Sequence, residues 1–187
     1  MQMGRPRSLR ALTTSADLAP LLQAMGGLPS EALAPLPVEI VSTGLPDIIL
    51  PIRDVDTLQA LRPDMAALTA LSDRFDVVGV HAFAFPEAGA SAGAAADCTA
   101  HVRNFAPRYG IPEESATGTA NGALAFYLYR QGLIRDAARC LFLQGAAMGL
   151  PSSVMAMLHL VPDGSAQGLR PDVRVGGPFA IVARGEI

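Results

Sequence analysis

The chain has 187 residues, of which 50% are hydrophobic and 17% charged, and its formal net charge is -3. This length and composition allow one well-buried core, so we expect a single domain over residues 1–187. The lack of clustered arginines argues against a nucleic-acid partner, because phosphate backbones are held by clustered cations. The sequence contains neither a membrane-length apolar run nor a signal-peptide core, so we expect a cytoplasmic protein with no membrane partner.

Residue usage excludes several chemistries. The chain has no lysine, which excludes a Schiff-base lysine, a pyridoxal-phosphate anchor and a P-loop lysine within it. Cys98 and Cys140 lie far apart without CxxC spacing, so we expect two reduced structural thiols. His81, His101 and His159 fall in apolar, β-like segments without ligand spacing, so we expect strand histidines and no metal. The abundance of Ala and Gly, with Arg as the basic residue, suggests a bacterial source.

Hydrophobic periodicity predicts mixed strands and helices in the first half of the chain. In chain order we expect a strand over residues 8–13, a helix that begins at a cap in 15–17 and ends at Gly26 and Gly27, a hairpin of strands 38–41 and 47–52, helices over 54–61 and 65–73, and a strand over 77–83. Thr43 and Gly44 form the turn of the hairpin.

The second half contains the most diagnostic element, a helix over residues 119–131. Its apolar side chains leave no continuous polar face, so it must be surrounded by protein, and Gly132 is expected to end it. Residues 87–96 form a low-complexity loop of small residues to which we assign no function. Strands are expected over 98–105, 140–144, 153–161, 173–176 and 179–183. The pattern predicts an α+β fold, in which a curved, mostly antiparallel sheet wraps round a buried central helix.

The loop at residues 110–120 places two acids before the start of this helix. Glu113 and Glu114 precede Thr117, after which the first backbone N–H groups of the helix are unpaired. Such a helix start favours anions through its N–H groups and its dipole. A carboxyl beside a bound carboxylate has its pKa raised by desolvation and like charge, as a general acid/base requires. The alternative is plain capping, with Thr117 as the N-cap residue, and the spacing leaves both open.

The same loop is part of a longer pattern. Residues 103–120 read RNFAPRYGIPEESATGTA, which is similar to R-x-F-A-P-x-x-G-I-x-E-D-P-A-T-G-S-A of the PhzF-like family, in the diaminopimelate-epimerase-like superfamily. Shorter stretches that resemble the family lie at residues 3–6, 42–46, 144–152, 175–177 and 185–186. The resemblance covers essentially the whole chain but only the C-terminal half of the family's usual protein, so we expect the family's N-terminal domain to be absent.

The resemblance implies proton transfer on a carbon acid, which is isomerisation or epimerisation of a small carboxylate-bearing metabolite. Two similar domains then face each other across a cleft, without a metal or organic cofactor. Glu114 falls on the family's Asp and becomes the proton-transfer residue. Gly118, Thr119 and Ala120 offer backbone N–H groups to the substrate carboxylate. Related epimerases use a thiol where this chain has Thr117, whose hydroxyl cannot replace a thiolate, so carboxylate chemistry is favoured.

The chain departs from the family's pattern at three positions and in one larger respect. Glu114 replaces Asp, Ser115 replaces Pro, and Leu150 replaces Arg. The family's first half supplies a glutamate, a histidine and a G-N-P turn, and no counterpart precedes Gly110. The leading hypothesis is therefore an isomerase half-domain that is completed by a second domain or subunit. The alternative is a non-catalytic fragment or subunit that binds a small acid or a partner N-terminal domain.

Two further expectations concern partners and Arg103. A separate half of this fold exposes the apolar cleft surface that its partner covers, so we expect a homodimer or pairing with an N-terminal-half subunit. Strand alternation places His101, Arg103 and Phe105 on one face. Arg103 therefore either helps to hold an anion near the loop or forms an ordinary structural ion pair.

Overall fold

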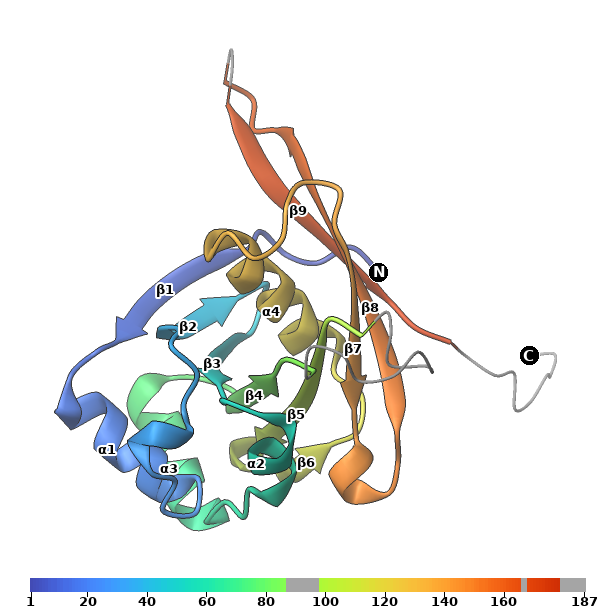
Figure 1. The fold of residues 1–187 in the computed structure, drawn as a ribbon. Coiled ribbons are helices and arrows are strands. Elements are labelled where there is room, and N and C mark those ends of the chain that lie inside the picture. Colours follow the sequence, from blue (N-terminus) through green and yellow to red (C-terminus); the bar gives the residue numbers. More distant parts are fainter. Residues whose placement is uncertain (87–97, 166–167, 179–187) are drawn as a thin grey trace, which may run out of the picture.

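The computed structural model describes residues 1–86, 98–165 and 168–178 (Figure 1). Its strands are β1 (Arg7–Leu12), β2 (Val38–Ser42), β3 (Pro46–Pro51), β4 (Val80–Ala84), β5 (Ala100–Ala106), β6 (Ile111–Glu114), β7 (Arg139–Gln144), β8 (Ser152–Pro162) and β9 (Leu169–Gly176). Its helices are α1 (Ser15–Ala24), α2 (Val55–Ala60), α3 (Met65–Phe75) and α4 (Gly118–Arg130). No helix of these described ranges is long and apolar enough to cross a membrane.

The strands form one sheet in the order β1-β2-β3-β4-β5-β7-β8-β9, and β6 adds to β5. Within the described residues, β3 pairs with β4 and β5 with β7 in parallel, and the other neighbours are antiparallel. The expected hairpin is present as β2 and β3, with Glu39 opposite Ile49. The prediction of a mostly antiparallel sheet is confirmed.

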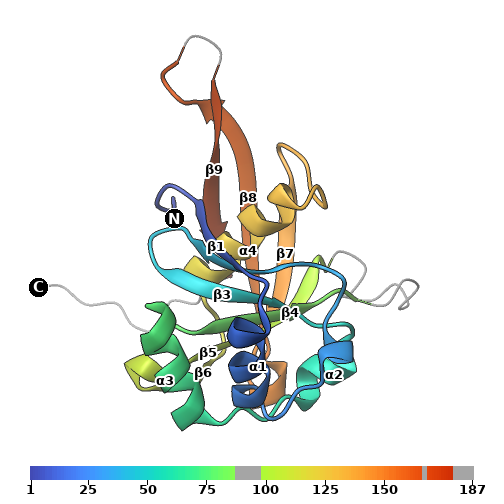
Figure 2. The ribbon, with the colours of Figure 1, turned by 90° about the vertical axis from the view of Figure 1, so that its left-hand side faces the viewer.

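Helices cover both faces of the sheet's middle strands. Figures 1 and 2 show α1, α2 and α3 on one side of β2 to β5 and α4 on the other. Strand alternation explains the division, because Ile48 and Leu50 of β3 join the core under α1 to α3, while Ile49 joins the core round α4. The middle strands of the sheet are thus buried on both faces, and the face toward α4 carries the polar residues of the candidate site.

The central helix α4 is buried along most of its length, as its all-round apolar pattern predicts. Residues 120–128 are all buried, and the helix packs on β2, β3, β8 and β9. The Tyr127 hydroxyl donates to the carbonyl of Pro37 at 2.7 Å, which satisfies its polar end. Gly122 leaves room for the sheet, since a Cβ there would lie 3.2 Å from Met3 and 3.3 Å from Val175. The predicted wrapping of a curved sheet round a central helix is confirmed.

Several predicted boundaries are wrong, for local reasons. Helix α1 is capped by Thr14, whose hydroxyl accepts from the Asp17 N–H at 3.2 Å, so the predicted cap at residues 15–17 lies inside the helix. Strand β4 begins at Val80, because the Val77 N–H bonds the Ser72 carbonyl and completes the end of α3. The predicted loop at 110–120 contains strand β6 and the first turn of α4. The predictions for residues 87–96 and 179–183 lie outside the described residues.

Candidate active site

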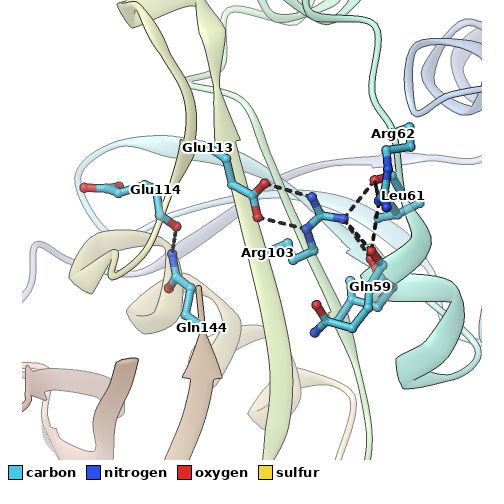
Figure 3. A network of polar contacts seen from close by, with 8 residues as sticks. Gln59, Leu61, Arg62, Arg103, Glu113, Glu114 and Gln144 are labelled. Atoms are coloured by element: carbon cyan, nitrogen blue, oxygen red, sulfur yellow. Dashed lines mark hydrogen bonds and ion pairs between the residues drawn. The ribbon is translucent and has the colours of Figure 1, made fainter. Parts of the chain in front are cut away.

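Strand β6 separates the two neighbouring glutamates of the loop. It pairs antiparallel with β5, with Glu114 opposite Asn104. Because successive side chains of a strand point to opposite faces, Glu113 and Glu114 diverge. Figure 3 shows Glu113 turned toward Arg103 and Glu114 turned away from it. Only Glu114 therefore faces the side of the sheet that holds α4.

Arg103 is a structural residue. Its Nε and Nη2 donate to the two carboxylate oxygens of Glu113, both at 2.8 Å, and its side chain is 6% exposed. Its Nη1 donates to the carbonyls of Leu58, Gln59 and Leu61 at the end of α2 (Figure 3). The planar guanidinium is suited to such a bidentate pair. Of the two expectations for Arg103, the geometry supports the ion pair, because the contacts with Glu113 and α2 occupy the guanidinium.

Glu114 is held by a hydroxyl and an amide. The Thr117 hydroxyl donates to Glu114 Oε2 at 2.5 Å, and Gln144 Nε2 donates to the Thr117 hydroxyl at 3.0 Å and to the Glu114 carbonyl at 2.7 Å. Gln144 Oε1 in turn accepts from the Thr117 N–H at 3.1 Å and from Asn121 Nδ2 at 2.8 Å. These contacts fix the position of the Glu114 side chain.

This network qualifies one expectation and adds one residue that was not predicted. Thr117 occupies the N-cap position of α4, but its side chain makes no capping hydrogen bond, so simple side-chain capping is not its role. Gln144 was not predicted as a site residue, although it bridges Glu114 and the helix. The only sequence signal for it was its place in the Gln144-Gly145 pair of the family-like stretch at residues 144–152.

The start of α4 offers free donors beside Glu114. Among the described residues, no acceptor is paired with the N–H groups of Gly118, Thr119 or Ala120. The Thr43 hydroxyl donates to the Thr119 carbonyl at 3.0 Å, which ties the turn between β2 and β3 to the helix. Gly118 and Thr119 line a cavity of about 380 Å³, while Ala120 is fully buried. These N–H groups and the helix dipole make this end of the cavity suitable for an anion.

A second carboxyl, Asp47, lines the same cavity as Glu114. Asp47 is 2% exposed, and burial, followed by the negative charge of Glu114, raises its pKa to about 8. The rest of the lining is largely apolar and includes Leu45, Tyr109 and Ile111. Sequence reasoning missed Asp47, and the available signal was a single acid in an otherwise apolar strand, PDIILP.

The histidines and cysteines stand apart from this chemistry. His81 is fully buried in β4, with Nδ1 3.0 Å from Asn104 Oδ1, and burial lowers its pKa to about 4, so it is neutral near pH 7. His101 and His159 lie in β5 and β8, as predicted. Cys98 and Cys140 are buried free thiols whose pKa values are raised by burial, which suits structural residues.

A metal site was not predicted, and the described part of the chain gathers no group of three or more His, Cys, Asp or Glu side chains that could hold a metal ion. The polar groups that line the cavity are instead carboxyls, hydroxyls and backbone amides. A cofactor-free reaction stays a prediction.

A curled sheet round a buried helix is the architecture of the diaminopimelate-epimerase-like fold. Over residues 3–185 the chain matches the family described as Phenazine biosynthesis-like protein, and it belongs to that family. A phenazine biosynthesis protein of the PhzF family from Bacillus anthracis has the same fold, with a TM-score of 0.74 at 20% identity, over 95% of this chain and 56% of that one.

The similar curated proteins are isomerases by name. An uncharacterized isomerase of Deinococcus radiodurans is 36% identical over 154 residues, which are 80% of this chain and 45% of the relative. The trans-2,3-dihydro-3-hydroxyanthranilate isomerase of Pseudomonas fluorescens is 33% identical over 169 residues, 90% of this chain and 52% of the relative. The chain thus spans about half the length of these relatives. Its assignment to their C-terminal half stays a prediction.

Proposed function

We propose that this chain forms one wall of an isomerase site that moves a proton on a small carboxylate-bearing metabolite. The observation that carries the proposal is the geometry at Glu114. Its carboxyl group accepts a hydrogen bond from the Thr117 hydroxyl. Glu114 lines the same cavity as Gly118 and Thr119, whose N–H groups have no acceptor among the described residues. A base and an anion site thus lie side by side, as abstraction of a proton next to a carboxylate requires.

In this proposal Glu114 takes the proton from a carbon whose C–H bond is conjugated with the substrate's carboxylate. Negative charge then builds up on the carboxylate oxygens, and the N–H groups of Gly118 and Thr119, which line the cavity, stabilise it. Thr117 and Gln144 position Glu114, and the hydroxyl of Thr117 has too high an ordinary pKa to be the base itself. The chemistry is carboxylate acid/base catalysis, and we propose that it uses no metal or organic cofactor.

The cavity limits the class of substrate. Its volume of about 380 Å³ suits a small molecule, and its apolar lining of Leu45, Val78, Tyr109 and Ile111 suits a hydrocarbon ring or short chain beside the carboxylate. The relative from Pseudomonas fluorescens is named for trans-2,3-dihydro-3-hydroxyanthranilate, which has these features. This compound is therefore the first substrate to test, and a role in phenazine synthesis does not follow from family membership.

We propose that a second domain completes the site, either in a homodimer or from a separate N-terminal-half subunit. Three apolar side chains at the cavity are exposed, namely Leu45 by 48%, Tyr109 by 60% and Ile111 by 40%. Clustered exposed apolar residues of this kind mark a surface that another protein covers. Light scattering checks this point, and a clean monomer of this chain that fails to bind a hydrophobic dye would count against it.

The test of the proposed function is the variant Glu114→Gln, which keeps the shape of the side chain but cannot accept the substrate's proton. We expect turnover of trans-2,3-dihydro-3-hydroxyanthranilate by the assembled protein to fall by about 100-fold or more. The matched control is Glu31→Gln, an exposed glutamate away from the cavity. Turnover that Glu114→Gln leaves at the wild-type rate would refute the role of Glu114.

A further inference from the structure

Asp47 is buried where a carboxyl is costly. It lies in β3 beside Ile48 and Ile49, it is 2% exposed, and its Oδ1 has no hydrogen-bond partner among the described residues. An unpaired buried carboxylate costs several kcal/mol in proteins, so such a group is neutral or has a ligand to bind. Asp47 also lines the cavity that contains Glu114 and the start of α4. It is therefore placed to face whatever the cavity holds.

The register of the sheet explains how the two acids meet. Ile49 of β3 is opposite His81 of β4, His81 is opposite Asn104 of β5, and Asn104 is opposite Glu114 of β6. Residues directly opposite one another share a face, so this row points toward α4. Asp47 lies two residues before Ile49 and so points to the same face.

The charged and titratable groups near Asp47 leave it without a cation partner. Glu114 from β6 is the nearest acid that acts on it, and Tyr109 also lines the cavity. His81 behind Asn104 is neutral, because burial lowers its pKa to about 4. Met1 contributes to the lining, and its α-amino group donates to the Val175 carbonyl at 2.7 Å. No arginine of the described residues lines this cavity.

The two acids therefore lie in different surroundings. Burial and the charge of Glu114 raise the pKa of Asp47 to about 8, so Asp47 holds its proton. Glu114 accepts a hydrogen bond from the Thr117 hydroxyl and is therefore placed as the proton acceptor. A buried carboxyl that holds its proton, beside a carboxyl that lines the same cavity, can serve as the acid of an acid and base pair, which an isomerisation needs together.

We propose that Asp47 is the second proton-carrying residue of the site, which delivers a proton to the substrate after Glu114 has removed one. This inference rests on the proposed function. Glu114 takes a proton from one carbon, the electron pair of that C–H bond shifts along the substrate, and a second carbon forms a new C–H bond with the proton of Asp47. Glu114 ends protonated and Asp47 ionised. Proton exchange between them, or with solvent, restores the starting state without an oxidant or reductant.

The experiment follows the NMR signal of the Asp47 carboxyl carbon as the pH is changed. This signal is assigned because it is absent from the spectrum of Asp47→Asn. We expect Asp47 to stay protonated through pH 7. In the variant Glu114→Gln the midpoint of the Asp47 titration should be lower, since the neighbouring charge is removed. The control is Asp56→Asn, an exposed acid of α2, which should leave the Asp47 signal unchanged. Ionisation of Asp47 in the ordinary acidic range of Asp would overturn the proposal.

Benzoate, a ring with one carboxylate, is the probe for contact with the cavity. Above the Asp47 midpoint we expect benzoate affinity to fall by about tenfold per pH unit in the wild type and to stay flat in Asp47→Asn. Binding that leaves the Asp47 midpoint unchanged would overturn the proposal, because Asp47 then does not face the ligand. A wild type that keeps Asp47 protonated but binds no benzoate would instead contradict the anion site at α4, which belongs to the proposed function.

Discussion

Replacement of Asp47 by Asn should change how the stability of this protein depends on pH. The ordinary pKa of Asp is 3.8, and in the folded protein burial raises that of Asp47 to about 8. Between these values the folded chain binds one proton more than the unfolded chain, so the free energy of unfolding falls as pH rises. The slope approaches about 1.4 kcal/mol per pH unit. Asp47→Asn carries no titrating proton here and should lack this contribution.

The difference is large enough to measure. From about pH 5 to about pH 7, the free energy of unfolding of Asp47→Asn should rise relative to wild type by about 2.7 kcal/mol. Urea titrations at several pH values give this difference, and Asp56→Asn is the control for loss of an exposed carboxyl. Burial of the Asn amide has a cost that does not depend on pH. It therefore changes the free energy of unfolding of Asp47→Asn by the same amount at every pH and leaves the slope against pH unchanged. Parallel curves for wild type and Asp47→Asn would show that Asp47 is ionised when folded and would refute the reasoning.

Two other variants test the contacts round the loop. Arg103→Met leaves the Glu113 side chain, which is 14% exposed, without its partner and should lower the free energy of unfolding by about 3 kcal/mol. Arg53→Met breaks an exposed ion pair with Asp54 and a hydrogen bond to the Glu31 carbonyl, and should lower it by under about 1 kcal/mol in the same urea titrations. Thr117→Val removes the hydroxyl that donates to Glu114 and should reduce turnover by about 10- to 100-fold, with Thr117→Ser near wild type. Equal turnover in the Val and Ser variants would exclude a role for this hydrogen bond.

Local pattern alone was enough to predict most elements of the fold. The helix α4 could be predicted because its apolar residues leave no polar face, which only a protein-surrounded helix tolerates. The β2–β3 hairpin could be predicted because two β-rich runs flank the turn at Thr43 and Gly44. Boundaries failed where one hydrogen bond decides them, as with the Thr14 hydroxyl that starts α1. Such bonds depend on side-chain position and not on periodicity.

The candidate site was predicted only in part, because its remaining members come from distant strands. Glu114 and the start of α4 lie close together in the sequence, and the resemblance of this loop to the PhzF-like pattern singled them out. Asp47 and Gln144 are 67 and 30 residues away from Glu114 along the chain. Only the pairing of strands brings Asp47 to the cavity and Gln144 to Glu114. Sequence spacing does not contain that information.

The chain thus carries two kinds of information about its function. Its order of residues determines the short-range features: the buried helix, the hairpin, the loop before α4 and the family to which the chain belongs. Sheet register and burial determine the chemistry, because they turn Glu113 toward Arg103, turn Glu114 toward the cavity, and keep Asp47 out of water. A pKa depends on what surrounds a group in space. The proton on Asp47 is therefore a property of the folded protein and not of the segment PDIILP.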